Sequence, residues 1–260
     1  MSELERRLLK FDPEAFLETM KYDVKKKLEE SSAKGIIVEL DDDISKAVTA
    51  IIGARAVGRE KVMAIHISLG RRSVRRLRNV NQIASMARLT LIVVDASTVK
   101  QSVLSSIPRV GGTKRDRERA KTATNKLEKW ISSMILNYYA EYHDFLVCRP
   151  INKSEILLGG LKRTGYLEGD LFPLSHVYQT HVGLIAKHLR VKSHTTDRSS
   201  LRGMKLCQEI PPQLIDSVLL GIESGWSDEE ILKDLGGGVS PHVVSELRKL
   251  VERNKKHLYV

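Results

Sequence analysis

GIIVELDDDISKAVTAIIGARAVG, residues 35–58, joins two different apolar patterns through an acidic turn. The first pattern, Ile36 to Leu40, is short and rich in β-branched residues, which is typical of a strand buried on both faces. The second, Ile44 to Val57, is almost entirely small and apolar, and Gly58 follows it where a helix commonly ends. The stretch therefore predicts a buried strand, a loop at Asp41 to Asp43 and a helix packed on a sheet.

Outward from this stretch, further strands and helices alternate along the chain. Apolar residues three and four positions apart indicate amphipathic helices, and short β-branched runs indicate strands. The predicted strands are Ile36–Leu40, Val62–Ser68, Leu89–Asp95 and Phe145–Cys148, and the predicted helices are Pro13–Ser31, Ile44–Val57, a basic helix through Leu77 and Ala87, and about 115–142. This alternation predicts parallel strands with right-handed crossovers.

The alternation of strands and helices weakens after Asp95, and the last part of the chain is predicted to contain helices only. After Asp95 a loop rich in Ser and Gly is expected to end at Gly112, and Tyr138, Tyr139 and Tyr142 are expected to pack within the long helix. The C-terminal helices are predicted at Val177–Leu189, Pro211–Gly225, Ser227–Leu235 and Pro241–Lys256. We expect a single α/β domain over residues 1–260, with a doubly wound parallel sheet of four to five strands, a core over 13–190 and a helical C-terminal cap over 191–260.

Composition narrows the class of protein. No apolar run approaches the roughly 20 residues of a membrane helix, and the N-terminus is too charged for a signal peptide. The two cysteines, Cys148 and Cys207, lack the C-x-x-C spacing of zinc or redox sites, so buried thiols are predicted. These features predict a soluble cytoplasmic protein that has no membrane contact.

The net charge of +11 favours polyanions as partners, although ion-paired surface charge would also account for it. The segment 70–78 contains the five arginines Arg71, Arg72, Arg75, Arg76 and Arg78 and no acidic residue. Because arginine suits phosphate, this stripe is a candidate site for nucleic acid or another polyanion. In the second basic segment, Thr113 to Lys121, the interleaved Asp116 and Glu118 favour ion pairs along the helix instead.

The loop after the first strand lies where a doubly wound domain holds phosphate. Here that loop reads Asp41, Asp42, Asp43, Ile44, Ser45 and Lys46. Three carboxylates repel a triphosphate, so ATP is not expected on it. Two interpretations remain open: a solvated acidic turn that favours the following helix N-terminus, or a site for Ca²⁺ or Mg²⁺.

Nearly the whole chain resembles the ammonia-dependent NAD synthetases of the ATP pyrophosphatase group, and this implies an adenine nucleotide alpha hydrolase-like fold. Residues 35–65 resemble that family's first strand, phosphate loop and helix, where the loop normally reads SGGxDS. Residues 152–155 (NKSE) resemble its nucleotide-side motif, and GGLKRTGYLEGDLFPL (159–174) resembles FTKYGDGGxDLLPI. HVYQTHVGLIAKHL (176–189) resembles LYKTQVRELARHL, and residues 227–258 resemble the C-terminal helices.

The family uses ATP and Mg²⁺ to adenylate the carboxylate of deamido-NAD, and ammonia then displaces AMP. By resemblance, Asp41, Asp42 and Asp43 replace the SGG of its loop, while Ser45 and Lys46 replace a metal-binding Asp and the final Ser. Pro150 stands in place of an ATP-contacting Thr, and Gln179 in place of a phosphate-contacting Lys. The resemblance therefore implies a vestigial ATP loop.

The dinucleotide half of the family's site is altered less. Arg163 corresponds to a Lys that contacts deamido-NAD, Asp170 to a contacting Asp, and Glu155 to a metal-binding carboxylate. Trp130, however, falls where an Arg of that pocket is expected, and His257 follows Lys256 where the family has the reverse order.

The leading hypothesis is a catalytically degenerate NAD synthetase-like protein with no intact catalytic residue, no cofactor and a binding or regulatory role. The resemblance implies a homodimer, or a heteromer with an intact synthetase. A rival hypothesis is an active ATP- and ammonia-dependent NAD synthetase that uses ATP and Mg with relocated metal ligands. Two more hypotheses stay open: a polyanion-binding module, and a sensor that binds deamido-NAD or NAD through Arg163 and Asp170 without turnover.

Overall fold

The computed structural model describes the chain except residues 71–73, 109–111, 161–168, 192–206, 208–209 and 256–260. The predicted site residues Arg71, Arg72 and Arg163, together with Lys256 and His257, lie outside the described residues. Predictions that concern those five residues are not tested by the structure.

The centre of the fold is a parallel sheet in the order β3-β2-β1-β4. Its strands are β1 (Gly35–Glu39), β2 (Val62–Ser68), β3 (Leu91–Asp95) and β4 (Phe145–Cys148). In the register, Val38 of β1 lies between Ala64 of β2 and Cys148 of β4. The chain passes outward from β1 to β3 and returns to β4 on the other side of β1, so that the strand order reverses between β1 and β4. The predicted α/β class and parallel sheet are confirmed.

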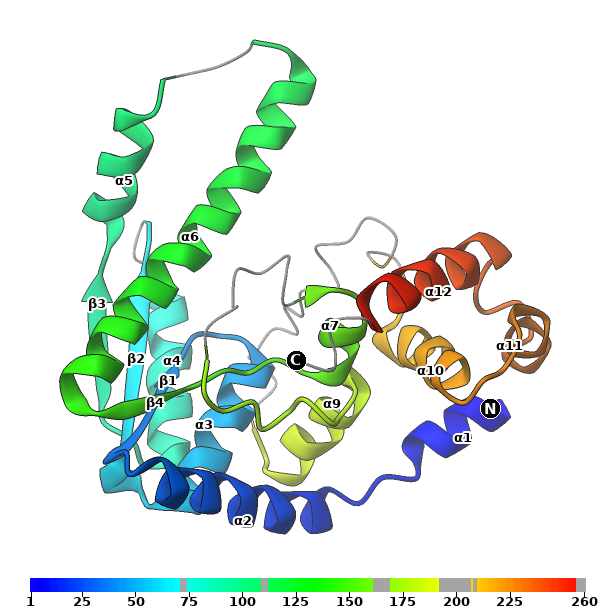
Figure 1. Cartoon of the computed structure of the whole chain (residues 1–260), viewed down its shortest axis with the longest axis horizontal. Coiled ribbons are helices and arrows are strands. Elements are labelled where there is room, and N and C mark those ends of the chain that lie inside the picture. Colours follow the sequence, from blue (N-terminus) through cyan, green and yellow to red (C-terminus); the bar gives the residue numbers. More distant parts are fainter. Residues whose placement is uncertain (71–73, 109–111, 161–168, 192–206, 208–209, 256–260) are drawn as a thin grey trace.

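Helices cover both faces of this sheet (Figure 1). The helices of the first core cluster are α2 (Pro13–Ser31), α3 (Ile44–Val57), α4 (Val74–Ala87) and α9 (Gln179–His188). They share that cluster with Ile36 and Val38, whereas Ile37 points to the opposite face and packs with α6 (Lys114–His143). This alternation follows from the two-residue period of a strand, and burial of both faces explains the apolar run of β1.

A separate core cluster joins the two ends of the chain. Its helices are α1 (Glu3–Leu9), α7 (Lys153–Leu157), α10 (Pro212–Glu223), α11 (Asp228–Leu235) and α12 (Pro241–Lys255). Leu4 and Leu8 of α1 are buried among residues of α10 and α11, and the backbone N–H groups of Glu3 and Leu4 donate to the carboxylate of Asp234 at 2.8 and 2.9 Å. The N-terminal helix thus belongs to the same cluster as the C-terminal helices.

Of two predictions about the middle of the chain, one is wrong and the other is confirmed only in part. The expected Ser/Gly loop contains a helix, α5 (Ser97–Ser106), which lies along α6 and is joined to it by a 2.5 Å ion pair between Lys100 and Glu128. Tyr139 packs against the core cluster beneath α6, as predicted, whereas Tyr138 and Tyr142 stack on each other at the surface and are 65% and 73% exposed. The face of α6 that meets the sheet is filled by other residues, including Ile131, Leu136 and Ala140.

Trp130, Met134, Tyr138 and Tyr142 recur every four residues on the exposed side of α6, and we call them the apolar stripe. Both cysteines are buried free thiols, as predicted. Among the described residues, no helix combines the length and the apolar character required to span a bilayer.

Candidate functional site

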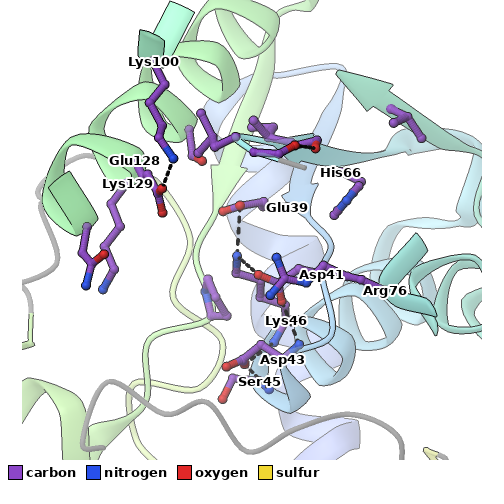
Figure 2. A pocket seen from close by; sticks show the side chains of 18 of the residues that line it. Glu39, Asp41, Asp43, Ser45, Lys46, His66, Arg76, Lys100, Glu128 and Lys129 are labelled. Carbon is purple, nitrogen blue, oxygen red and sulfur yellow. Dashed lines mark hydrogen bonds and ion pairs between the residues drawn. The ribbon is translucent and has the colours of Figure 1, made fainter. Parts of the chain in front are cut away.

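A cavity of about 580 Å³ opens at the carboxyl ends of the strands (Figure 2). Glu39 and Asp41 from the end of β1, Lys46 from α3, and Pro150 and Glu155 from the segment after β4 all line it. This is the place where open parallel sheets bind ligands, beside the point at which the strand order reverses. The cavity is therefore the candidate site.

The acidic turn caps helix α3. The carboxylate of Asp43 accepts hydrogen bonds from the backbone N–H groups of Ser45 (2.8 Å) and Lys46 (3.3 Å), as an N-cap residue does. The predicted support of the helix N-terminus is confirmed. The solvated state predicted for the turn is wrong for Asp42, which is only 7% exposed, whereas Asp41 and Asp43 are partly exposed.

Lys46 supplies a positive charge to two carboxylates of the site, Glu39 and Asp41. Its ammonium lies 3.0 Å from Glu39 and 2.7 Å from Asp41, and the side chains of Lys46 and Glu39 are each 10% exposed. Burial opposes ionisation of Asp41, but the charge and hydrogen bond of Lys46 outweigh it, and the pKa of Asp41 lies below its usual value. The three side chains form an ion-paired group beside the loop, in which Lys46 and Glu39 are nearly buried and Asp41 is partly exposed.

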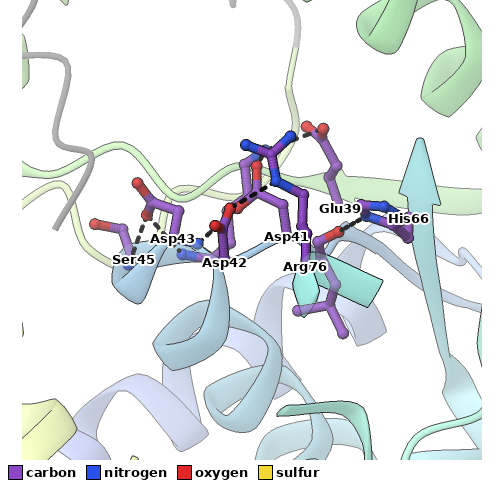
Figure 3. A network of polar contacts seen from close by, with 9 residues as sticks. Glu39, Asp41, Asp42, Asp43, Ser45, His66 and Arg76 are labelled. Carbon is purple, nitrogen blue, oxygen red and sulfur yellow. Dashed lines mark hydrogen bonds and ion pairs between the residues drawn. The ribbon is translucent and has the colours of Figure 1, made fainter. Parts of the chain in front are cut away.

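A second cation reaches the turn from α4. The guanidinium of Arg76 lies 3.2 Å from the carboxylate of Asp42 (Figure 3). The segment 70–78 contains no acidic residue, and the acidic partner of Arg76 comes instead from a distant part of the sequence. Arg75 and Arg78 are exposed, and within the described part of the chain neither forms an ion pair.

The surroundings of Asp43 in the cavity disfavour its negative charge. Burial, together with the charges of Asp41 and Glu155, raises its pKa to about 7, although Lys46 opposes the shift. Burial also lowers the pKa of Lys129, which faces the cavity from α6. Near neutral pH, Asp43 is therefore present in both its protonated and its ionised form.

The remaining predicted site residues lie in several places. Pro150 and Glu155 line the cavity, whereas the buried Gln179 accepts a 2.6 Å hydrogen bond from the side chain of Asn152. Asp170 accepts a 2.7 Å hydrogen bond from the backbone N–H of Val147 and is not among the residues that line the cavity. The structure thus brings Glu155 to the acidic turn and leaves Asp170 in a backbone contact at β4.

Sequence reasoning missed several polar residues of the cavity, among them Glu39, His66, Lys100 and Lys129. His66 is buried, and its Nδ1 lies 2.8 Å from the carbonyl oxygen of Leu40. A signal was present for two of them, because Glu39 and His66 are polar residues near the carboxyl ends of otherwise apolar strands. Lys100 and Lys129 come from α5 and α6, and nothing local to those segments marks them.

The groups of the loop that could bind a phosphate or a metal ion have partners within the protein. A phosphate at the N-terminus of α3 would meet the side chain of Asp43, which already accepts the N–H groups of Ser45 and Lys46. Glu39 and Asp41, which could offer oxygen ligands to a cation, bind the ammonium of Lys46. Among the described residues, no three His, Cys, Asp or Glu side chains are grouped so that they could hold a metal ion.

Comparison with known proteins agrees with this topology. The family model for NAD synthase matches residues 16–259. The NH(3)-dependent NAD(+) synthetase of Methanocaldococcus jannaschii is 25% identical over 238 residues, covering 89% of this chain and 89% of that protein. The enzyme of the same name from Methanococcus aeolicus is 26% identical over 211 residues, covering 79% of this chain and 81% of that protein.

Solved structures share the fold. The NH3-dependent NAD synthetase from Campylobacter jejuni, in complex with the nitrate ion, superposes with a TM-score of 0.75 at 18% identity, covering 96% of this chain and 97% of that chain. An NMN synthetase from Francisella tularensis superposes with a TM-score of 0.66 at 16% identity, covering 96% of this chain and 97% of that chain. Because the family model spans almost the entire sequence, the chain belongs to the NAD synthase family.

Proposed function

We propose that this chain is a catalytically degenerate member of the NAD synthase family with a binding or regulatory role. The observation that carries the proposal is the ion-paired group of Lys46 with Glu39 and Asp41 at 3.0 and 2.7 Å. The resemblance to the family places a triphosphate at this loop, where charged side chains of the protein itself already lie. The proposal therefore includes neither ATP nor Mg as a cofactor.

Two features of the loop support this proposal. The first is the N-terminus of α3, where anions usually bind through free backbone N–H groups. Here the carboxylate of Asp43 accepts the N–H groups of Ser45 and Lys46. A phosphate group could replace it only if Asp43 left its cap position, and the buried Asp42 nearby would still repel the phosphate. An acidic side chain in this position thus replaces the anion that the helix terminus would attract.

The second feature is the state of the cations around the loop. Arg76, which could contact a phosphate, is 3.2 Å from Asp42, and Lys100 is 2.5 Å from Glu128. Binding a triphosphate through these cations would require the ion pairs to separate and would take the cation Arg76 from the buried carboxylate of Asp42. Buried charges without partners are costly, so the pairing disfavours a polyanionic nucleotide.

The test is NAD formation by the purified chain with ATP, Mg²⁺, deamido-NAD and ammonia, beside the Methanocaldococcus jannaschii synthetase as the active control. We expect no NAD above background. Turnover by this chain that disappears in a Glu155→Gln variant would overturn the proposal and establish the rival hypothesis, an active synthetase with an atypical loop.

The resemblance implies a homodimer, or a heteromer with an intact synthetase, and we further propose that the apolar stripe is the surface through which either assembly forms. The stripe residues are Trp130, Met134, Tyr138 and Tyr142, whose exposed fractions are 53%, 56%, 65% and 73%. Four large apolar side chains in one exposed row are typical of an interaction surface.

Size-exclusion chromatography with light scattering tests this assembly, first on the chain alone and then on a mixture with an active synthetase. A Met134→Glu and Tyr138→Glu double variant should be monomeric and should not enter a mixed complex. A monomeric wild-type chain that also fails to bind the synthetase would contradict the proposal.

A further inference from the structure

The N-terminal half of α6 extends away from the sheet and stands clear of the body of the protein (Figure 1). We call Lys114–Lys126 the basic arm. At 1.5 Å per residue its 13 residues are about 20 Å long. Most of its side chains are exposed, and the first buried residue of α6 is Ile131. Packing against the core therefore does not account for the composition of this half of the helix.

The basic arm carries six cations and two carboxylates, a net charge of +4. The ion pairs predicted along this segment are wrong. Asp116 is used in the capping box instead, where its carboxylate accepts hydrogen bonds from the backbone N–H and the hydroxyl of Thr113 at 3.1 and 2.6 Å. Within the described part of the chain, no ion pair joins Glu118 or any of the six cations to another residue. The positive charge of the arm is thus uncompensated.

The six cations form two rows. At 3.6 residues per turn, Arg115, Arg119 and Lys126 fall within a sector of about 40°, and Lys114, Arg117 and Lys121 within about 60°. The centres of the two sectors are about 150° apart, nearly on opposite sides of the helix. One of the two faces between the rows carries Asp116, which is used in the capping box, and the small residues Ala120 and Ala123, which leave room for close approach by another molecule.

This arrangement matches the grooves of double-helical DNA. An α-helix with side chains is about 10–12 Å across, and the major groove of B-DNA is about 12 Å wide with a phosphate backbone along each edge. Two rows of cations on opposite sides of one helix can reach both backbones at once. The deep, narrow major groove of RNA duplexes excludes such a helix.

We propose that the basic arm binds double-stranded DNA through contacts with the phosphates on both edges of the major groove, without reading the bases. The inference deepens the proposed binding role. Its test measures DNA binding, whereas the test of the proposed function measures NAD formation, so either can fail without the other. The basic arm ends at Lys126, before Trp130, and so leaves the apolar stripe available for the proposed assembly.

Fluorescence anisotropy with a labelled 20-base-pair DNA of arbitrary sequence, at 50 to 200 mM salt, tests the proposal on the full chain. If six phosphates are neutralised, the logarithm of affinity falls with the logarithm of salt concentration with a slope of about −5. Replacing Arg115, Arg119 and Lys126 by Gln should reduce that slope by about 3 and weaken binding at least tenfold at 100 mM salt.

The matched control removes the same formal charge elsewhere: Lys25→Gln, Lys26→Gln and Lys27→Gln on α2, where the side chains are also exposed. This variant should retain most of the affinity and slope. Circular dichroism and light scattering confirm that each variant keeps its fold and assembly. All the substituted residues are exposed, so loss of folding is not expected.

Three results would overturn the proposal. The control variant could lose as much affinity as the arm variant, which would mean that binding follows net charge. A variant with Arg75→Gln and Arg78→Gln could lose more, which would place the site on α4. An RNA duplex or polyglutamate could bind as tightly as DNA, which would assign the arm to RNA or to acidic proteins.

Discussion

Replacing Lys46 by Met should destabilise the protein strongly, because methionine keeps the apolar length of the side chain and removes the ammonium. Glu39 would then lie in a nearly buried position with no cation at 3.0 Å. Removing one partner of a buried ion pair costs about 3–5 kcal/mol. Asp41 is 28% exposed and can regain water more easily, so we expect the lower end of that range, about 3 kcal/mol.

The loss should depend on pH. In the wild type the charge of Lys46 offsets the effect of burial, which raises the pKa of Asp41. Without Lys46 the folded pKa of Asp41 should exceed the unfolded one, so stability is retained at low pH and lost as the pH rises through the folded pKa. The Lys46→Met variant should therefore be closer to wild type at pH 5 than at pH 8.

Urea unfolding followed by circular dichroism at pH 5 and pH 8 measures both effects. Lys21→Met is the matched control, since Lys21 pairs with Glu18 at 3.4 Å on the surface, with exposed fractions of 50% and 69%, and should cost under about 1 kcal/mol. Adding Glu39→Gln to Lys46→Met should recover part of the loss. If Lys46→Met costs no more than Lys21→Met at pH 8, the reasoning that this group is a buried ion pair is wrong.

Three further substitutions have definite expected results. Asp43→Asn keeps an acceptor at the N-cap but cannot ionise. Because the folded pKa of Asp43 is about 7, the stability of the wild type should fall as the pH rises from about 4 to 7. The melting temperature of the variant should therefore exceed that of the wild type by an amount that grows over this range. Gly53→Ala would place a Cβ 2.6 Å from Ile36 and should cost about 1–3 kcal/mol, so an unchanged or higher melting temperature would contradict the packing. Asp216→Ala should cost about 2–3 kcal/mol in urea unfolding, because the fully buried carboxylate accepts hydrogen bonds from the backbone and hydroxyl of Thr180 at 2.7 and 2.6 Å; a loss below about 1 kcal/mol would refute this.

Local pattern was sufficient to predict the fold around residues 35–58, where helix α3 has the predicted bounds Ile44 and Val57. Burial on both faces forces an apolar strand, and the helix that covers it must also be apolar, so composition and structure coincide there. Helix α5 was missed for the opposite reason. It has no buried residue and depends on α6, which begins only at Lys114, for its contacts.

The candidate site was predicted only in part. The acidic turn was located correctly, but its surroundings depend on Lys46 and on Arg76, which approaches from another helix. Whether three adjacent carboxylates are solvated or buried depends on such cations, and a sequence does not indicate which cation reaches which carboxylate. The same limit explains why ion pairs were expected along the basic arm, where Asp116 instead caps the helix.

The position of α1 among the C-terminal helices has a consequence for folding during synthesis. Leu4 and Leu8 are made long before α10 and α11, so their buried contacts with these helices cannot form until residues up to Leu235 have left the ribosome. Closing a loop of that length has an entropic cost, and the contact forms late. While the sheet folds, α1 therefore lacks its contacts with α10 and α11, and these do not yet cover Leu4 and Leu8. A fusion partner attached at Met1 would lie beside the last contacts to form, and would slow the final folding step more than one attached elsewhere.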